Sequence, residues 1–317
     1  MDTATWWDPT SLRYEQSTHA LAHINKRVDS NGDKYDNFHK ALFCLARGLP
    51  ADNRFLVSND DDRGEGEAVS NLVSQASKLY LTDKFYDGSA FRALLTLDPP
   101  VYNVYEVFKE KCQSPTRSEH EIIKEQSKVH LRLRKVVDLF DLRRNVANRE
   151  KVGSVLGGLL YLIRCNISHG HKMSFGGNLT NKIIRDEMVT DHGLRVLRQI
   201  IEKLLGEPQH RLAVYGSLRS CHENHELIAD LGDPDVGSVV GMINMAGDYP
   251  VFRWASDGQD IPVEIYRSPK LTPQRLRKLD EFEGNSYRRM FIPVRLTDGS
   301  FQVSTIYAEN ARSSFEL

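Results

Sequence analysis

Cysteine is scarce in this 317-residue chain. The four cysteines form no C-x-x-C pair and lie at Cys44, Cys112, Cys165 and Cys221. Scattered cysteines provide neither a zinc-ligand pair nor a disulfide framework, and they favour a reducing, cytoplasmic environment. The N-terminus has no basic region followed by an apolar core, which a signal peptide would require. The longest apolar run, Val155 to Ile163, is far shorter than the roughly 20 residues of a membrane helix. We therefore expect a soluble cytoplasmic protein without a membrane segment, a metal or a cofactor.

The chain also lacks an excess of either charge, because 42 Lys and Arg residues nearly cancel 43 Asp and Glu residues. The overall charge therefore does not indicate a nucleic-acid partner, and any basic surface must be local. The chain is longer than most domains with a single hydrophobic core, so its length favours two domains.

Apolar residues recur at intervals of three and four through most of the first two thirds of the chain, as in amphipathic helices. The acidic, glycine-containing stretch from Ser58 to Gly66 is typical of a solvated loop. Pro99-Pro100 and Pro115 divide the middle of this region. The predicted helices are Tyr14 to Val28, Tyr35 to Arg47, Ala68 to Leu81, two pieces within Ala90 to Lys111, Ser118 to Phe140, Ser154 to Ser168 and Thr190 to Leu205.

From Arg211 onward, short apolar runs bounded by turn residues indicate strands, and Asp298-Gly299 is a hairpin signal. Only Glu223 to Leu231 and Pro273 to Glu281 have helical patterns. We predict an all-helical domain over residues 1–208 and a mixed, strand-rich domain over 209–317. The predicted strands are Leu212 to Tyr215, Val236 to Met245, Val251 to Trp254, Val263 to Tyr266, Met290 to Leu296 and Phe301 to Tyr307.

Arg164 and His169 mark the first candidate site, at the end of an apolar helix. Five residues turn two side chains about 140° apart on an unbroken helix, so the pair converges only at a helix end or across a dimer. A neutral His can accept the proton of a ribose 2'-hydroxyl, and an Arg can stabilise the phosphate as charge develops.

The segment Arg164-Cys165-Asn166-Ile167-Ser168-His169-Gly170 resembles the R-x4-6-H signature of HEPN domains. The resemblance implies a helical bundle that dimerises to form a metal-independent RNA-cleaving cleft. Arg164 and His169 would then be catalytic and Asn166 would bind substrate, with tRNA or mRNA as the target. A toxin or antiviral defence role follows from the same family context. Cys165 stands where such domains commonly carry a polar residue.

The second candidate site begins at Tyr215-Gly216-Ser217-Leu218, directly after a predicted strand. Backbone N–H groups in such a turn can bind a carboxylate, and the glycine permits close approach. Farther on, the chain contains Leu279-Asp280-Glu281-Phe282-Glu283-Gly284 and then Tyr287-Arg288-Arg289.

Together these motifs resemble the gamma-glutamylcyclotransferase-like fold, particularly its gamma-glutamylamine branch. The resemblance implies a small barrel in which residues 215–218, with Tyr287 nearby, hold a glutamyl group. Glu283 would transfer the proton while the α-amine attacks the γ-carbonyl and releases 5-oxoproline. Cys221 and Val263 replace glycines of the family pattern, which could narrow the pocket.

Our leading hypothesis from the sequence is a homodimeric HEPN-type endoribonuclease with a C-terminal domain that binds or processes a glutamyl-type ligand. The alternative is that the cyclotransferase-like domain is the enzyme and the helical domain a dimerising or RNA-binding scaffold. In a third reading, both sites are inactive and the chain is a regulatory partner.

Overall fold

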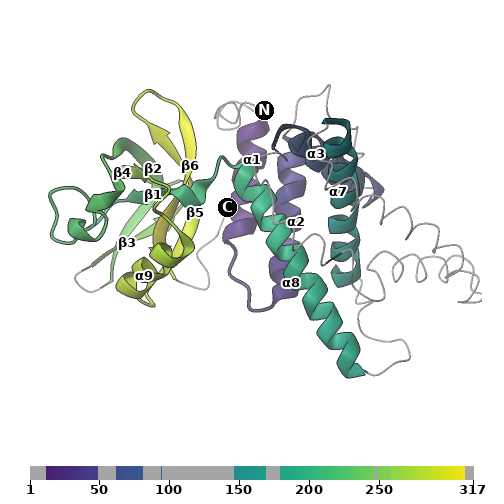
Figure 1. The fold of residues 1–317 in the computed structure, drawn as a ribbon. Helices are drawn as coiled ribbons and strands as arrows, with labels where there is room; N and C mark the ends of the chain where they lie inside the picture. The colour runs from purple at the N-terminus through teal and green to yellow at the C-terminus, as the bar shows by residue number, and fades with distance from the viewer. Residues whose placement is uncertain are drawn as a thin grey trace, which may run out of the picture. The chain divides into compact units, whose positions relative to one another are not determined.

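The computed structural model of the chain (Figure 1) describes residues 12–48, 62–80, 94, 146–168, 179–246, 249–255 and 257–310. The chain divides into two compact units. One is helical and spans residues 28–201, and the other combines residues 2–27 with residues 202–317. Among the helices of the described ranges, none is both long and apolar enough to cross a bilayer.

The helical unit contains α2 (Asn31–Arg47), α3 (Asp62–Tyr80), α7 (Val146–Ser168) and α8 (Leu179–Leu204). The α2 helix begins where the Ser30 hydroxyl accepts a hydrogen bond from the Asp33 N–H, at 3.0 Å, which satisfies one of the open donors at the helix start. Tyr35 of α2 is fully buried, and its hydroxyl donates to the Leu160 carbonyl of α7 at 2.8 Å. The helices are therefore joined by a buried polar contact as well as by an apolar core.

Small residues bring α3 and α7 into close contact. A Cβ atom at Gly157 would lie 2.5 Å from the Ser70 Cα, and one at Gly66 would lie 2.6 Å from the Tyr161 ring. These distances are shorter than carbon atoms tolerate, so larger side chains would push the two helices apart. Gly66 and Gly157 therefore allow α3 and α7 to pack closely, and neither glycine interrupts its helix.

The start of α3 corrects one expectation. The stretch from Ser58 to Gly66 has a loop-like composition, yet α3 begins at Asp62 and Glu65 is only 7% exposed. Glu65 can be buried because Arg164 of α7 pairs with its carboxylate. The α7 and α8 helices also begin earlier than predicted. The helices expected within 90–111 and 118–140 lie outside the described residues, apart from Leu94.

The second unit is a β-barrel with short helices. Strands β2, β4, β1, β6 and β5 follow one another around it, and β2 pairs with β5 to close the ring. The strand β3 extends the sheet from the second half of β2. Among the strands that the structure describes, only β1 and β6 pair in parallel. The strands are β1 (Arg211–Val214), β2 (Asp235–Ala246), β3 (Tyr249–Trp254), β4 (Gln259–Arg267), β5 (Tyr287–Leu296) and β6 (Phe301–Glu309).

Successive side chains of a strand point to opposite faces of the sheet, so the barrel unit has one core inside the barrel and another between the barrel and α9. Ala213 packs inside the barrel, whereas Leu212 and Val214 on the other face of β1 pack with α9 (Pro273–Glu283). Figure 1 shows α9 beside the barrel strands. At the closure of the barrel, a Cβ atom at Gly237 would lie 2.6 Å from the Arg295 carbonyl, so β2 and β5 can approach only at a glycine. The predicted helix over 223–231 is instead two short 3₁₀ helices, His225–Leu227 and Ala229–Leu231.

The N-terminal helix α1 (Leu12–Asn25) packs with the barrel unit. The side-chain amide of Asn25 donates to the Phe291 carbonyl at 2.6 Å and accepts from the Phe291 N–H at 2.9 Å. On its other side Phe291 pairs with Thr305 of β6. The Asn25 amide therefore completes the backbone hydrogen bonding of β5, as a neighbouring strand would.

Replacing Asn25 with Ala is expected to destabilise the barrel unit by about 1–3 kcal/mol, because two backbone groups of Phe291 lose their partner in a largely buried position. Urea unfolding followed by a barrel-specific tryptophan signal would measure the loss. Asn310→Ala removes a more exposed contact with Arg27 and is expected to cost less. If the Asn25 variant were as stable as the wild type, the Asn25 amide would not stabilise β5 through the Phe291 backbone.

Candidate functional site

The barrel unit contains an open cavity of about 710 Å³. Residues from the turn after β1, the start of β3, the end of α9 and the start of β5 line it. The C-terminal site residues that we predicted from the sequence are all among its lining: Tyr215, Gly216, Ser217, Leu218, Glu283 and Tyr287. Segments about 65 residues apart in the sequence are thus brought to one cavity by the barrel topology.

The turn after β1 is held by its own backbone. The Arg219 N–H donates to the Gly216 carbonyl at 3.1 Å, and the Asn224 N–H donates to the Ser217 carbonyl at 3.2 Å. Tyr215, the first residue after β1, accepts a hydrogen bond from the Phe252 N–H of β3 at 3.0 Å. The turn therefore has a fixed shape in the wall of the cavity. A turn of fixed shape can bind a substrate carboxylate through its backbone N–H groups.

Glu264 fixes the far end of this turn, although it does not line the cavity. Its carboxylate accepts hydrogen bonds from the Ser220 N–H at 2.6 Å and from the Tyr266 hydroxyl at 2.9 Å. Partial burial raises the pKa of Glu264, but hydrogen bonds from the Ser220 hydroxyl, the Ser220 N–H and the Tyr266 hydroxyl outweigh it and leave the pKa below its ordinary value. Glu264 therefore stays ionised at neutral pH and positions the turn.

Glu283 is the last residue of α9. The helix begins at Thr272, whose hydroxyl accepts from the Arg275 N–H, and it ends at Gly284, which adopts a φ of 73°. The half-buried carboxyl of Glu283 lies in the wall of the cavity, and burial raises its pKa to about 7. At neutral pH this group can both accept and donate a proton.

Three residues before Glu283, Asp280 anchors α9 to the barrel. Its carboxylate pairs with Arg289 of β5 at 2.7 Å and accepts from the Tyr307 hydroxyl of β6 at 2.9 Å. Because Asp280 and Glu283 share the last turn of α9, these contacts fix where the Glu283 carboxyl can lie. We did not single out Asp280 from the sequence, although its place in the Leu279-Asp280-Glu281-Phe282-Glu283 motif was a usable signal.

Tyr287 connects the start of β5 to β3, since its hydroxyl donates to the Pro250 carbonyl at 3.1 Å. Burial raises the pKa of Tyr287, and the nearby Glu283 carboxyl adds to the effect. Tyr287 therefore stays protonated, next to the group that titrates near neutrality.

The two departures from the family pattern do not close the cavity. Val263 is 2% exposed and packs in the barrel core, and Cys221 is exposed; neither is among the residues that line the cavity. Cys221 nevertheless adopts a φ of 65°, a conformation that favours glycine.

Replacing Cys221 with Gly is expected to stabilise the barrel unit by roughly 1 kcal/mol, because it removes the steric cost of the left-handed conformation. Thermal unfolding of the two proteins would measure the difference. Cys221→Ala keeps the Cβ atom and is expected to give no such gain. A Gly variant that is less stable than the wild type would contradict the strain argument.

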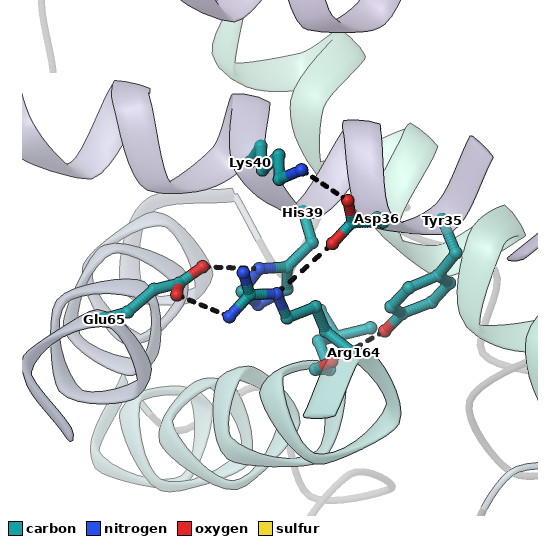
Figure 2. A network of polar contacts seen from close by, with 7 residues as sticks. Tyr35, Asp36, His39, Lys40, Glu65 and Arg164 are labelled. Carbon is teal, nitrogen blue, oxygen red and sulfur yellow. Dashed lines mark hydrogen bonds and ion pairs between the residues drawn. The ribbon is translucent and has the colours of Figure 1, made fainter. Parts of the chain in front are cut away.

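Arg164, from the first candidate site, lies in a polar network of the helical unit (Figure 2). Its guanidinium pairs with Glu65 at 2.7 Å and with Asp36 at 3.3 Å, and its side chain is 18% exposed. His39 of α2 is fully buried, with Nδ1 3.2 Å from the Glu65 carboxylate. Burial lowers the pKa of His39, although Glu65 opposes the shift.

The other residues predicted for this site cannot be placed beside Arg164. Asn166 belongs to α7, but its side chain is outside the described residues, as is the whole of His169. The sequence did not indicate the partners that Arg164 does have, because Asp36 and Glu65 are distant from it along the chain. In the ranges that the structure describes, no cluster of three or more His, Cys, Asp or Glu residues could hold a metal ion.

Comparisons with known proteins concern the barrel unit. Residues 212–314 match the family model described as gamma-glutamyl cyclotransferase, AIG2-like. An AIG2-like protein from Mus musculus is 22% identical over 34% of this chain and 79% of its own, with a TM-score of 0.29. YkqA from Bacillus subtilis is 27% identical over 32% of this chain and 36% of its own, with a TM-score of 0.27.

No curated protein matches the chain. The family match does not extend to the helical unit, so a HEPN domain is not shown. The closed barrel fits the fold expected of the matched family. Residues 212–314 therefore contain a C-terminal domain of the gamma-glutamyl cyclotransferase, AIG2-like family.

Proposed function

We propose that the barrel unit is a cyclotransferase acting on γ-glutamyl amides. The α-amine of the glutamyl group attacks the γ-carbonyl carbon, a new C–N bond closes the five-membered ring, and the original amide C–N bond breaks. The proton lost by the attacking nitrogen is transferred to the leaving nitrogen. The products are 5-oxoproline and a free amine, and no water is consumed.

The observation that carries this proposal is the Glu283 carboxyl in the cavity wall, with its pKa raised to about 7 by burial. A proton carrier works best when its pKa lies near the working pH, because it must accept and then return the same proton. The turn at residues 215–218 lines the same cavity and offers backbone N–H groups for the α-carboxylate of the substrate. Binding in this way would also hold the α-amine against the γ-carbonyl.

The pH dependence follows from this role. Glu283 must be ionised to accept a proton, so kcat/KM, which reports the pKa of the free protein, is expected to rise between about pH 5 and pH 8 with a midpoint near 7. Steady-state release of 5-oxoproline from a γ-glutamyl alkylamide would give the profile. A midpoint near 4.3, the ordinary pKa of glutamate, would contradict the role of the buried carboxyl.

The ribonuclease hypothesis for the helical unit stays a prediction, as do its RNA substrate and homodimer. None of the comparisons supports it, and Arg164 already has two carboxylate partners. The test is RNA degradation by the purified wild type and by His169→Ala. Equal degradation by both proteins, or by neither, would refute the hypothesis.

A further inference from the structure

A short turn, residues 284–286, joins two residues of the cavity wall. Glu283 precedes it as the last residue of α9, and Tyr287 follows it as the first residue of β5. Both side chains line the cavity. Across the turn, the Tyr287 N–H donates to the Gly284 carbonyl at 3.4 Å. A displacement of this turn would therefore move the Glu283 carboxyl within the cavity.

Asn310, the residue directly after β6, holds the turn 284–286. Its backbone N–H donates to the Ser286 carbonyl at 2.9 Å, and its side-chain amide donates to the Asn285 carbonyl at 2.8 Å. The Oδ1 atom of the same amide accepts a hydrogen bond from the Arg27 guanidinium at 3.1 Å. Arg27 also donates to the Asn310 main-chain carbonyl, at 3.2 Å. Because Arg27 occupies Oδ1, the amide presents its NH₂ group to the Asn285 carbonyl.

Arg27 is itself kept close to β5 by the end of α1. Two residues before it, the carbonyl of Asn25 accepts a hydrogen bond from the Arg288 guanidinium of β5 at 2.5 Å. A cation interacts favourably with the carbonyl end of a helix, and Asn25 is the last residue of α1. The Asn25 amide also pairs with the backbone of Phe291. Arg27 is thus attached to the strand that follows the turn 284–286.

From these contacts we propose that Arg27 is a positioning residue of the candidate active site, which acts through Asn310 to hold the turn 284–286 and with it the Glu283 carboxyl. The effect on turnover rests on the proposed function, whereas the position of Glu283 can be measured without a substrate. Arg27 lies far outside residues 212–314, the segment that matches the cyclotransferase family. The chain enters the helical unit at the next residue, Val28.

The pKa of Glu283 reports the position of its carboxyl group, because burial raises this pKa to about 7. Three tyrosines lie close enough to interact with its charge, and burial raises the pKa of each, so they remain neutral at pH 7: Tyr215, Tyr287 and Tyr307. If the turn lost its contact with Asn310, water would reach the Glu283 carboxyl more easily. Its pKa would then fall toward about 4.3, the ordinary value for glutamate.

The test follows the Glu283 carboxyl by ¹³C NMR during a pH titration of the full chain labelled with carboxyl-¹³C glutamate, and Glu283→Gln identifies its signal. We expect Asn310→Ala to lower the pKa of Glu283 from about 7 to about 6 or below, and Arg27→Ala to lower it less. On a γ-glutamyl alkylamide, Asn310→Ala should reduce kcat about tenfold with little change in KM, because the turn at 215–218 is unaltered.

Three further variants show whether Arg27 acts through Asn310. Adding Arg27→Ala to Asn310→Ala should lower the Glu283 pKa no further, since the two residues belong to one chain of contacts. Arg27→Lys keeps a donor for Asn310 and should restore most of the pKa. Lys26→Ala is the matched control, because it removes an exposed cation beside Arg27 and leaves the contact of Arg27 with Asn310 in place.

The titration separates this inference from the proposed function. A lower Glu283 pKa in both Asn310→Ala and Arg27→Ala supports the positioning role even if the wild type releases no 5-oxoproline, in which case the cyclotransferase proposal fails by itself. An unchanged Glu283 pKa in either variant would overturn the inference. Additive effects in the double variant, or an equally large effect of Lys26→Ala, would also overturn it.

Discussion

Glu283→Gln is expected to reduce kcat for 5-oxoproline release by a factor of about 10²–10⁴, the usual contribution of a positioned proton carrier. Glutamine keeps the size and the hydrogen-bonding groups of the side chain, but it cannot exchange a proton at neutral pH. Steady-state assays on a γ-glutamyl alkylamide, with KM and kcat determined separately, would measure the effect. A loss in kcat with a nearly constant KM is the expected form, because the turn at 215–218 is unchanged.

The same substitution is expected to stabilise the barrel unit above neutral pH. The pKa of Glu283 is higher in the folded chain than in the unfolded chain, so the folded state binds more protons between about pH 4.3 and pH 7. Stability therefore falls as the pH rises through this range. Glu283→Gln removes the cost of the buried charge, and we expect a gain of about 1–3 kcal/mol at pH 8 in urea unfolding.

Glu281→Gln is the matched control, since Glu281 is an exposed glutamate of the same helix that does not line the cavity. Its activity and stability should equal those of the wild type. A Glu283→Gln protein that keeps more than about a tenth of the wild-type kcat would show that another group carries the proton.

Arg164→Ala is expected to destabilise the helical unit by about 3 kcal/mol. The Arg164 guanidinium bridges α7 to Asp36 of α2 and Glu65 of α3, and the Glu65 side chain is only 10% exposed. Removing the cation would leave Glu65 in a largely buried position beside His39, whose pKa burial holds below its ordinary value. Helical circular dichroism during urea unfolding would measure the loss.

Arg195→Ala provides the comparison for a surface ion pair. Arg195 pairs with Asp191 at 2.8 Å but is 60% exposed, so its loss should cost less than about 1 kcal/mol. Arg164→Lys should lie between the two, because lysine keeps the charge without the fork that reaches both carboxylates. An Arg164→Ala protein as stable as the wild type that no longer degrades RNA would favour the ribonuclease hypothesis over this structural role.

The C-terminal site could be predicted because its signals are local. The turn at residues 215–218 and the end of α9 each carry a short motif, and a barrel brings both motifs to one cavity. Glu223 could not be predicted as a lining residue, because an exposed glutamate has no distinctive pattern. Only its position around the cavity separates it from ordinary surface residues.

The polar network around Arg164 could not be predicted for a different reason. An acidic, glycine-containing stretch is usually solvated, and nothing local shows that Glu65 is buried against an arginine 99 residues away. Similarly, the amphipathic pattern of α1 shows that one face is buried but not which core it joins. Asn25 pairs with Phe291 of the barrel, 266 residues later, a contact that only the fold defines.

The most direct test of the central claim is the identity of the products in H₂¹⁸O. The purified protein would be incubated with a γ-glutamyl alkylamide, and the products identified by mass spectrometry. Cyclotransfer consumes no water, so we predict 5-oxoproline without ¹⁸O and an equal amount of free amine. Glutamate carrying ¹⁸O would indicate hydrolysis instead, and that result, or the absence of any product, would contradict the account.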